Sequence, residues 1–272
     1  HCIGKRHFYP QMLHLGFDAI ETYEADQYFD DSYVNDYREW LRERTNGTME
    51  ERDHGVQSNS WYARPSHLPE ELHNNTWVAT RGRQFLRHRD PTRPFFLNLS
   101  FHRPHPPADP PAVYFDYYRD REIPEPPVGE WARANDVPPS DINAARGHLS
   151  KRLLQNYARA YYAQIAHIDN QVGRLLASLK GHGPTWVIFT SDHGEMLGDH
   201  HLFRKTYAYE GSARIPFIVC PPGNAKVHAC DAPVVLEDIL PTVLDAAGIE
   251  CPEAVEGRRV APSLETSPGE AG

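Results

Sequence analysis

One segment restricts the possible folds of this chain more than any other, because its apolar side chains recur every three or four residues from Ser150 to Leu179. They are Leu153, Leu154, Tyr157, Tyr161, Ile165, Ile168, Val172, Leu175, Leu176 and Leu179. This spacing places them along one stripe and predicts a single long amphipathic helix with one buried face. Two short apolar runs follow it, TWVIFTSD from Thr185 and IPFIVCPPG from Ile215, and each has the length of a strand.

Other segments continue this alternation of strands and helices. The aromatic-rich run Phe95–Phe101, which lies between prolines, predicts a buried strand, and Leu236–Ile249 predicts a helix that ends at Gly248. We find no internal repeat. The alternation predicts a single α/β domain over residues 1–272, with a largely parallel sheet. The polar, acidic residues 18–60 are expected to form surface helix and loop, and the proline-rich residues 104–141 a long irregular loop.

Composition excludes some classes of partner. The formal net charge of −9 argues against nucleic acid, whose affinity comes from basic side chains that neutralise phosphates. No apolar run approaches the roughly 20 residues that span a bilayer, so we predict no membrane span. The first residues lack the order of a signal peptide, and the compartment and the oligomeric state stay open. The four cysteines lack paired spacing and are either thiols or include one bridge, Cys220–Cys230 or Cys230–Cys251.

Polar side chains follow two of the predicted strands at the point where each ends. His102 and His105 follow Phe95–Phe101, and Asp192 and His193 follow Trp186–Thr190. Because ligands of α/β sheets bind beyond the carboxyl ends of the strands, we expect these side chains to meet in one crevice. Lys205 adds a positive charge within reach of it.

The chemistry of this set suits a divalent cation that holds an anionic ester, as in phosphoryl or sulfuryl transfer. The alternative is that Asp192 and His193 form an ordinary capping pair. We expect His102 to be structural and His105 to be the reactive histidine.

Four segments carry a resemblance to a known family. They are GKRHF (Gly4–Phe8), FHRPHPP (Phe101–Pro107), SDHGEMLGDHHLFRKTYAYEGSARIPFIV (Ser191–Val219) and LEDILPTVLDAAGI (Leu236–Ile249). In this order they resemble the sulfatases of the alkaline phosphatase superfamily. The resemblance implies an alkaline phosphatase-like α/β/α sandwich with a largely parallel mixed sheet, and hydrolysis of a small-molecule or saccharide sulfate ester.

The resemblance also implies a role for individual residues. Lys5 and His7, in the G-K-x-H motif, would bind the sulfate oxygens, and His105 would be the acid for the leaving group or a sulfate ligand. Lys205 would bridge the sulfate and the leaving oxygen. Asp192 and His193 would be metal ligands, usually for Ca²⁺, with Mg²⁺ or Mn²⁺ as alternatives.

The nucleophile of the family is a formylglycine made from Cys or Ser in a C/S-x-P-S/A-R motif, and this chain contains no such string. The resemblance therefore implies that the chain lacks the N-terminal segment with the nucleophile and two metal-binding aspartates, and is inactive alone. It also implies that a small C-terminal antiparallel subdomain is missing or divergent. Two alternatives remain: a phosphonate or phosphate ester hydrolase of the same superfamily, or a catalytically inactive module that binds metal and anion.

The proline-rich loop carries four aromatic residues, Tyr114, Phe115, Tyr117 and Tyr118. They can stack on a sugar or aryl ring of a substrate, or they can anchor the loop to the core. The sequence does not separate these two roles.

Overall fold

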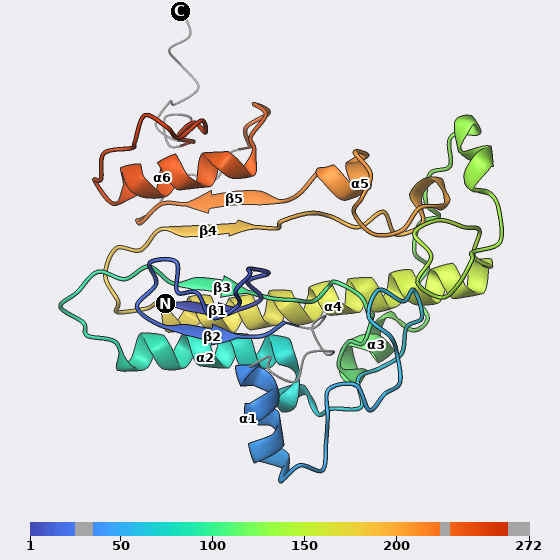
Figure 1. Ribbon diagram of the computed structural model, residues 1–272, viewed down its shortest axis with the longest axis horizontal. Coiled ribbons are helices and arrows are strands. Elements are labelled where there is room, and N and C mark those ends of the chain that lie inside the picture. The colour runs from blue at the N-terminus through green and yellow to red at the C-terminus, as the bar shows by residue number, and fades with distance from the viewer. Residues whose placement is uncertain (25–34, 224–228, 261–272) are drawn as a thin grey trace, which may run out of the picture. The chain divides into compact units, whose positions relative to one another are not determined.

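The computed structural model describes residues 1–24, 35–223 and 229–260 (Figure 1). The chain divides into two compact units. Unit 1 comprises His1–Gly183 and Glu195–Ser212, and unit 2 comprises Pro184–Gly194 and Ala213–Gly272. That residues 1–272 act as one catalytic domain stays a prediction.

Unit 1 contains a parallel sheet of three short strands, β1 (Cys2–Gly4), β2 (Ile20–Thr22) and β3 (Asn98–Ser100), in the order β2-β1-β3. The central strand β1 is completely buried. Gly4 is required at its end, because its φ is +105° and a Cβ there would lie 2.0 Å from the Ser100 carbonyl oxygen. The G-K-x-H motif therefore begins at a close approach of β1 to β3 that only glycine permits.

Two long helices of unit 1 pack against each other, α2 (Asn74–His88) and α4 (Lys151–Ser178) (Figure 1). Gly82 of α2 permits close packing, since a Cβ there would lie 2.8 Å from Leu99 and 3.3 Å from Leu175. Helix α4 is the predicted long helix, and the Ser150 hydroxyl caps it by accepting from the Leu153 N–H.

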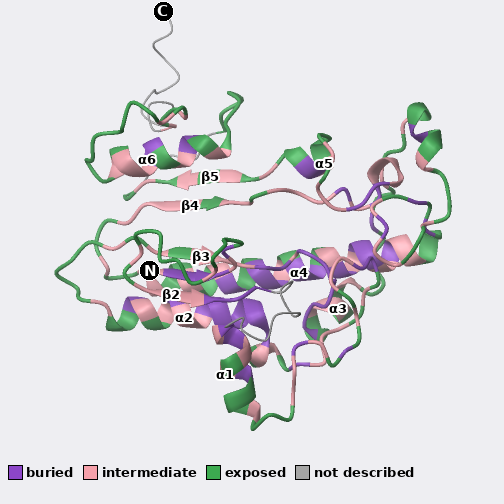
Figure 2. Cartoon of the chain, viewed as in Figure 1, coloured by how far each residue is buried: buried purple, intermediate pink, exposed green. Residues whose placement is uncertain are grey.

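The buried face of α4 differs from the predicted apolar stripe, although Figure 2 shows that the helix is buried over much of its length. Its buried residues are small or polar for the most part: Gln155, Tyr157, Ala158, Ala160, Ala163, Gln164, His167, Ile168 and Gln171. By contrast, Ile165 is 41% exposed and Leu176 is 43% exposed. Periodicity located the helix but not the side chains that its neighbours cover.

The expectation that residues 18–60 lie on the surface is wrong for the part of this segment that the structure describes; residues 25–34 lie outside the described residues. Tyr23, Tyr37 and Leu41 are fully buried and form a core cluster with Ile3 and other apolar side chains. Tyr37 and Leu41 lie on the inner face of α1 (Asp36–Thr45), whose other residues are mainly charged. A few apolar residues at helical spacing are enough to bury one face of such a helix.

The expectation of a buried strand over Phe95–Phe101 is also wrong. Only Asn98–Ser100 forms a strand, and none of its residues is buried. Phe96 is 55% exposed. The aromatic run marked the position of β3 but not its extent or its burial.

The proline-rich loop is partly ordered into the helix α3 (Ala112–Tyr118) and the 3₁₀ helix η2 (Glu130–Asn135), and α3 packs on α4. Phe115 packs against a second core cluster that includes Tyr157 and Phe203. The ring of Tyr118 stacks on Tyr162, whereas Tyr117 is 61% exposed. Phe115 and Tyr118 thus anchor the loop.

Unit 1 also contains the 3₁₀ helices η1 (Glu70–Leu72) and η3 (Asp199–His201).

Unit 2 contains the antiparallel strands β4 (Val187–Thr190) and β5 (Phe217–Cys220), with Val187 opposite Cys220. The 3₁₀ helix η4 (Leu236–Asp238) leads into α6 (Ile239–Ala246), and Gly248, with φ +67°, ends this segment as predicted. The short helix α5 (Glu210–Ala213) contains the boundary between the units.

Each unit combines strands with helices, in agreement with the predicted α/β class, and the strand pairing is parallel in unit 1 and antiparallel in unit 2. Among the residues described, no helix is both long and apolar enough to cross a membrane. All four cysteines are free, so neither of the two alternative bridges forms.

Candidate active site

Two of the predicted site residues meet in unit 1. The Lys205 Nζ lies 2.8 Å from the His105 Nε2, and the His105 Nδ1 lies 2.8 Å from the Pro106 carbonyl oxygen. Because an ammonium group only donates hydrogen bonds, Nε2 accepts from Lys205 and the Nδ1–H donates to Pro106. The geometry therefore holds a neutral His105 with its Nε2 directed at a lysine ammonium group.

His102 lies beside this pair, and its ring centroid is 4.8 Å from that of His105. Burial lowers the pKa of His102 well below its ordinary value, and the positive charges of Arg103, Lys5 and Lys205 lower it further. His102 is thus neutral. We call Lys5, His102, His105 and Lys205 the basic cluster.

The G-K-x-H motif is held by a carboxylate that sequence analysis missed. The backbone N–H of Arg6 lies 2.5 Å from the Glu24 Oε1, and that of His7 donates to the same oxygen. The His7 Nδ1 lies 3.7 Å from the Glu24 Oε2. Lys5 is tied to β3, since its N–H donates to the Ser100 carbonyl at 3.1 Å. The His7 side chain is 70% exposed. Nothing local in the sequence indicates that Glu24, just beyond β2, serves this loop.

A second missed carboxylate holds the loop of His102 and His105. Asp109 forms a bidentate ion pair with Arg103, with distances of 2.6 Å and 3.0 Å, and accepts a third bond from His54 at 3.1 Å. Burial raises the pKa of Asp109, but the Arg103 charge and these hydrogen bonds outweigh it and hold the pKa well below the usual range. The sequence does not predict this ion pair, because Arg103 and Asp109 are six positions apart in an irregular, proline-rich segment.

The loop that carries Lys205 is fixed on both sides. The backbone N–H of Arg204 donates to the Glu195 Oε1 at 2.6 Å, and the Ser212 hydroxyl donates to the Lys205 carbonyl at 2.8 Å. Burial raises the pKa of Glu195, whose carboxylate accepts the hydrogen bond from Arg204. Lys205 is therefore placed by its backbone and not only by its contact with His105.

The two predicted metal ligands lie in unit 2, directly after β4. The His193 Nε2 lies 3.5 Å from the Asp192 Oδ2, and the His193 Nδ1 lies 2.9 Å from the Gly194 carbonyl oxygen. When Nδ1–H donates to that carbonyl, Nε2 is the unprotonated nitrogen, as in a histidine that ligates metal.

The distance between the Asp192 Oδ2 and the His193 Nε2 also suits two ligands of one metal ion. Two ligand atoms that each lie about 2.1–2.4 Å from an ion are roughly 3 Å apart. An oxygen and a nitrogen in this arrangement fit a divalent cation. Asp192 and His193 belong to unit 2 and the basic cluster to unit 1. Their expected convergence stays a prediction.

Comparison with known proteins places these motifs in a family context. A family model described as Sulfatase matches residues 3–249. The chain is 42% identical to an arylsulfatase of Clostridium perfringens, over 94% of this chain and 57% of that protein. It is 33% identical to the multifunctional alkaline phosphatase superfamily protein PehA of Trinickia caryophylli, over 74% of this chain and 43% of that protein.

The fold has counterparts among solved structures. The phosphonate monoester hydrolase of Agrobacterium radiobacter aligns with a TM-score of 0.75 and 23% identity, covering 98% of this chain and 60% of that one. At this identity the likeness shows the fold alone, and it confirms the predicted alkaline phosphatase-like architecture. The chain spans about half the length of the curated relatives it matches.

Proposed function

Because the chain belongs to the sulfatase family, we propose that the protein hydrolyses sulfate monoesters. The observation that carries this proposal is the hydrogen bond between Lys205 and His105 within the basic cluster. A sulfate monoester is an anion whose leaving oxygen gains negative charge as the S–O bond breaks. Fixed positive donors aimed at that oxygen stabilise the transition state more than the ground state.

The residues then take the following roles. Lys5 and His7 bind the non-bridging sulfate oxygens, and Glu24 holds the loop on which both lie. Lys205 faces the leaving oxygen, and the proton that Lys205 shares with His105 ends on the departing alcohol. His105 orients the Lys205 ammonium group through Nε2, since its own Nδ1 proton is engaged by Pro106.

The family implies a divalent metal and a formylglycine; the metal would neutralise charge at the ester, and the formylglycine would provide the attacking oxygen. Asp192 and His193 are the proposed metal ligands in this chain. The resemblance favours Ca²⁺, with Mg²⁺ or Mn²⁺ as alternatives, although the imidazole of His193 is not the oxygen ligand that Ca²⁺ prefers. Equilibrium binding of Ca²⁺, Mg²⁺ and Mn²⁺ to the wild-type protein and to His193→Asn, which offers an amide oxygen, separates these alternatives.

The substrate is proposed to be a small aryl or saccharide sulfate. The relative from Clostridium perfringens is named an arylsulfatase. A structure with a TM-score of 0.56 and 22% identity, BT4656, is described in complex with its substrate D-glucosamine-2-N,6-O-disulfate. Of the loop aromatics, Tyr117 is exposed, with the Arg121 guanidinium over its ring at 4.0 Å, whereas Phe115 packs against the core.

Hydrolysis of phosphonate or phosphate esters is the second candidate, suggested by the name of the structure with a TM-score of 0.75. The decisive experiment compares an aryl sulfate with a phenyl phosphonate monoester as substrates of the full-length protein, produced with a formylglycine-generating system. We expect kcat/KM to be higher for the sulfate. A higher value for the phosphonate would replace the proposal, and no turnover of either would favour the inactive metal- and anion-binding module.

The assignment of Lys205 is tested in the same assay. Lys205→Ala should lower kcat for the aryl sulfate by about 10²-fold or more, because removal of one preorganised donor costs roughly 3 kcal/mol of transition-state stabilisation. Lys180→Ala, which removes an exposed lysine after α4, is the matched control and should leave kcat unchanged. A wild-type kcat for Lys205→Ala would refute the role of this lysine.

A further inference from the structure

Three side chains of the kinds that ligate metal ions lie close together in unit 1. Asp136, His148 and His201 each offer one ligand atom, and these atoms all lie within 4.8 Å of one another. The His148 Nδ1 lies 2.7 Å from the Asp136 Oδ1. The rings of His148 and His201 are stacked, with centroids 5.0 Å apart and an angle of 22° between their planes. We call these three residues the Asp-His-His cluster.

Main-chain hydrogen bonds join the three segments that carry the cluster. The N–H of His148 donates to the Val137 carbonyl at 2.8 Å, next to Asp136. The N–H of Gly147 donates to the His201 carbonyl at 2.9 Å. The three residues are therefore held together by their backbones, independently of any attraction between their side chains.

His200, which precedes His201 in the sequence, makes other contacts and does not belong to the cluster. The His200 Nδ1 accepts a hydrogen bond from the Gly129 N–H at 3.1 Å, and its ring packs on Trp131 at a centroid distance of 4.6 Å. Both His200 and His201 have positive φ values, 56° and 59°. This backbone conformation directs two successive histidines to different neighbours, and only His201 joins Asp136 and His148.

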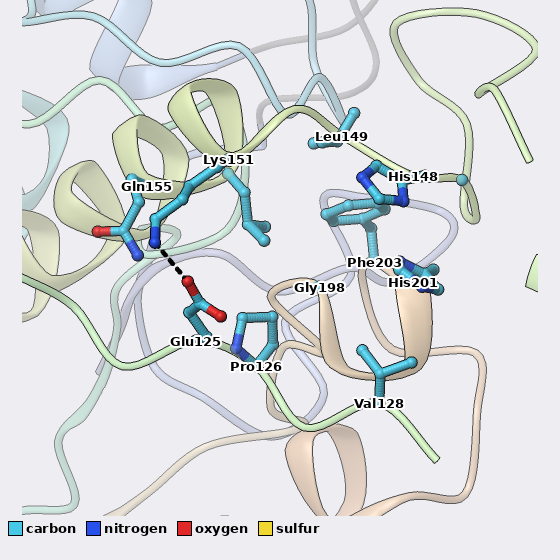
Figure 3. Close-up of a pocket in the computed structure, with 12 residues that line it drawn as sticks. Glu125, Pro126, Val128, His148, Leu149, Lys151, Gln155, Gly198, His201 and Phe203 are labelled. Carbon is cyan, nitrogen blue, oxygen red and sulfur yellow. Dashed lines mark hydrogen bonds and ion pairs between the residues drawn. The ribbon is translucent and has the colours of Figure 1, made fainter. Parts of the chain in front are cut away.

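The cluster is accessible to an ion. The side chains of Asp136 and His148 are each 55% exposed. His148 and His201 also line a pocket of about 280 Å³ (Figure 3). Figure 3 shows them with Phe203 on one side of it, while Lys151 pairs with Glu125 on the other.

We propose that Asp136, His148 and His201 form a metal site, separate from Asp192 and His193, for a divalent transition metal of which Zn²⁺ fits best. Two imidazole nitrogens with one carboxylate oxygen form a ligand set that Zn²⁺ favours, whereas Ca²⁺ and Mg²⁺ prefer sets made of oxygen alone. Three protein ligands leave the fourth tetrahedral position for water or for a small ligand from the pocket. This site neither depends on the proposed sulfatase activity nor contributes to it.

The observed spacing needs only small adjustments. Zinc bonds of about 2.0–2.2 Å place tetrahedral ligand atoms roughly 3.4 Å apart. On zinc binding, the distance between the Asp136 Oδ1 and the His148 Nδ1 would increase from 2.7 Å towards this value, and the His201 ring would move towards both atoms. Rotation of partly exposed side chains accomplishes this without a change in the backbone.

The test is calorimetric titration of the full-length protein with Zn²⁺ in excess Ca²⁺. Cys220, Cys230 and Cys251 are replaced by Ser, since these exposed thiols would also bind zinc. We expect one zinc ion per chain, with affinity lowered about tenfold or more by each of Asp136→Asn, His148→Ala and His201→Ala. His88→Ala, an exposed histidine of α2, is the matched control and should bind zinc as tightly as the parent protein.

Cobalt supplies a second measurement. Co²⁺ in the parent protein should give the visible absorption of a four-coordinate ion, and His148→Ala should abolish it. Thermal unfolding without metal verifies that each variant is folded. Zinc affinity that is unchanged in all three cluster variants, or an absence of zinc binding once the cysteines are replaced, would overturn the proposal.

Discussion

Two buried carboxylates, Glu24 and Asp109, position the basic cluster without belonging to it. Glu24 receives the backbone N–H groups of Arg6 and His7, and Asp109 neutralises Arg103. Each holds a loop that carries predicted site residues, Glu24 the loop of His7 and Asp109 the loop of His105. Their loss should therefore change stability and, through the loops, the position of the site.

Asp109→Asn should destabilise unit 1, because it leaves the buried Arg103 guanidinium without its main counter-charge. Breaking a buried ion pair from one side typically costs about 3–5 kcal/mol. Urea unfolding measures this cost. The matched control is Asp116→Asn, which breaks a surface pair with Arg119 and should cost less than about 1 kcal/mol. Equal costs for the two variants would contradict the account of Asp109.

A buried histidine should make stability depend on pH. His73 is fully buried, and burial lowers its pKa from 6.5 to about 4, while Asp109 raises it and Arg103 and His54 lower it. Between pH 6.5 and about 4 the unfolded chain binds a proton at His73 that the folded chain does not bind. The free energy of unfolding therefore falls as the pH falls through this window, by about 2 kcal/mol from His73 alone between pH 7 and pH 5.

Urea unfolding of His73→Asn at the two pH values tests this prediction. Asparagine keeps an acceptor for the Asn75 N–H at the start of α2 but does not titrate. In His73→Asn, the decrease in the free energy of unfolding between the two pH values should be smaller by about the amount assigned to His73. In the exposed control His88→Asn, the decrease should be the same as in the wild-type protein. An unaltered fall in His73→Asn would assign the pH dependence to other groups, such as His167, whose pKa burial lowers to about 2.

At the scale of single elements, two buried glutamines of α4 hold neighbouring loops by hydrogen bonds. The Gln155 amide donates to the Ile123 carbonyl at 2.8 Å and accepts from the Ile123 N–H at 3.3 Å. The Gln164 amide donates to the Pro107 carbonyl and to Asp109. The helix therefore supports both the proline-rich loop and the loop of His105.

Gln155→Leu should loosen the proline-rich loop, because both buried backbone groups of Ile123 lose their partner. Each of the two lost hydrogen bonds should cost about 1–3 kcal/mol, because it leaves a buried backbone group of Ile123 without its partner. Limited proteolysis should then cleave residues 119–149 faster than in the wild-type protein. Gln84→Leu, on the exposed face of α2, is the control. Wild-type cleavage rates in Gln155→Leu would show that other contacts hold the loop.

At the scale of the whole molecule, metal binding should depend on more than this chain. Asp192 and His193 are two ligands, whereas Ca²⁺ takes about six to eight. We predict weak or undetectable Ca²⁺ binding by the 272-residue chain produced alone, and no turnover of aryl sulfate by it. A protein of the full length of its relatives should bind the metal and turn over the substrate. Calorimetry that shows tight Ca²⁺ binding to the chain alone would refute the first expectation.

The sequence alone determined the features that depend on short stretches of chain. The period of Leu153 to Leu179 located α4, the apolar runs after it located β4 and β5, and Gly248 marked the end of the α6 segment. The four ordered segments from Gly4 to Ile249 indicated the sulfatase family, which the family model confirms. These signals are strong because hydrogen bonding within a helix and turn geometry involve residues close in sequence.

Only the tertiary structure decided which side chains are buried and which meet. It buried Tyr23 and Tyr37 from a polar segment, left Phe96 exposed, and buried glutamines of α4 while Ile165 and Leu176 of its apolar stripe stayed exposed. It also joined His105 to Lys205, and His148 to His201. The physical reason is that burial and contact depend on which distant elements pack against a surface, and residue patterns within one segment do not specify that neighbour.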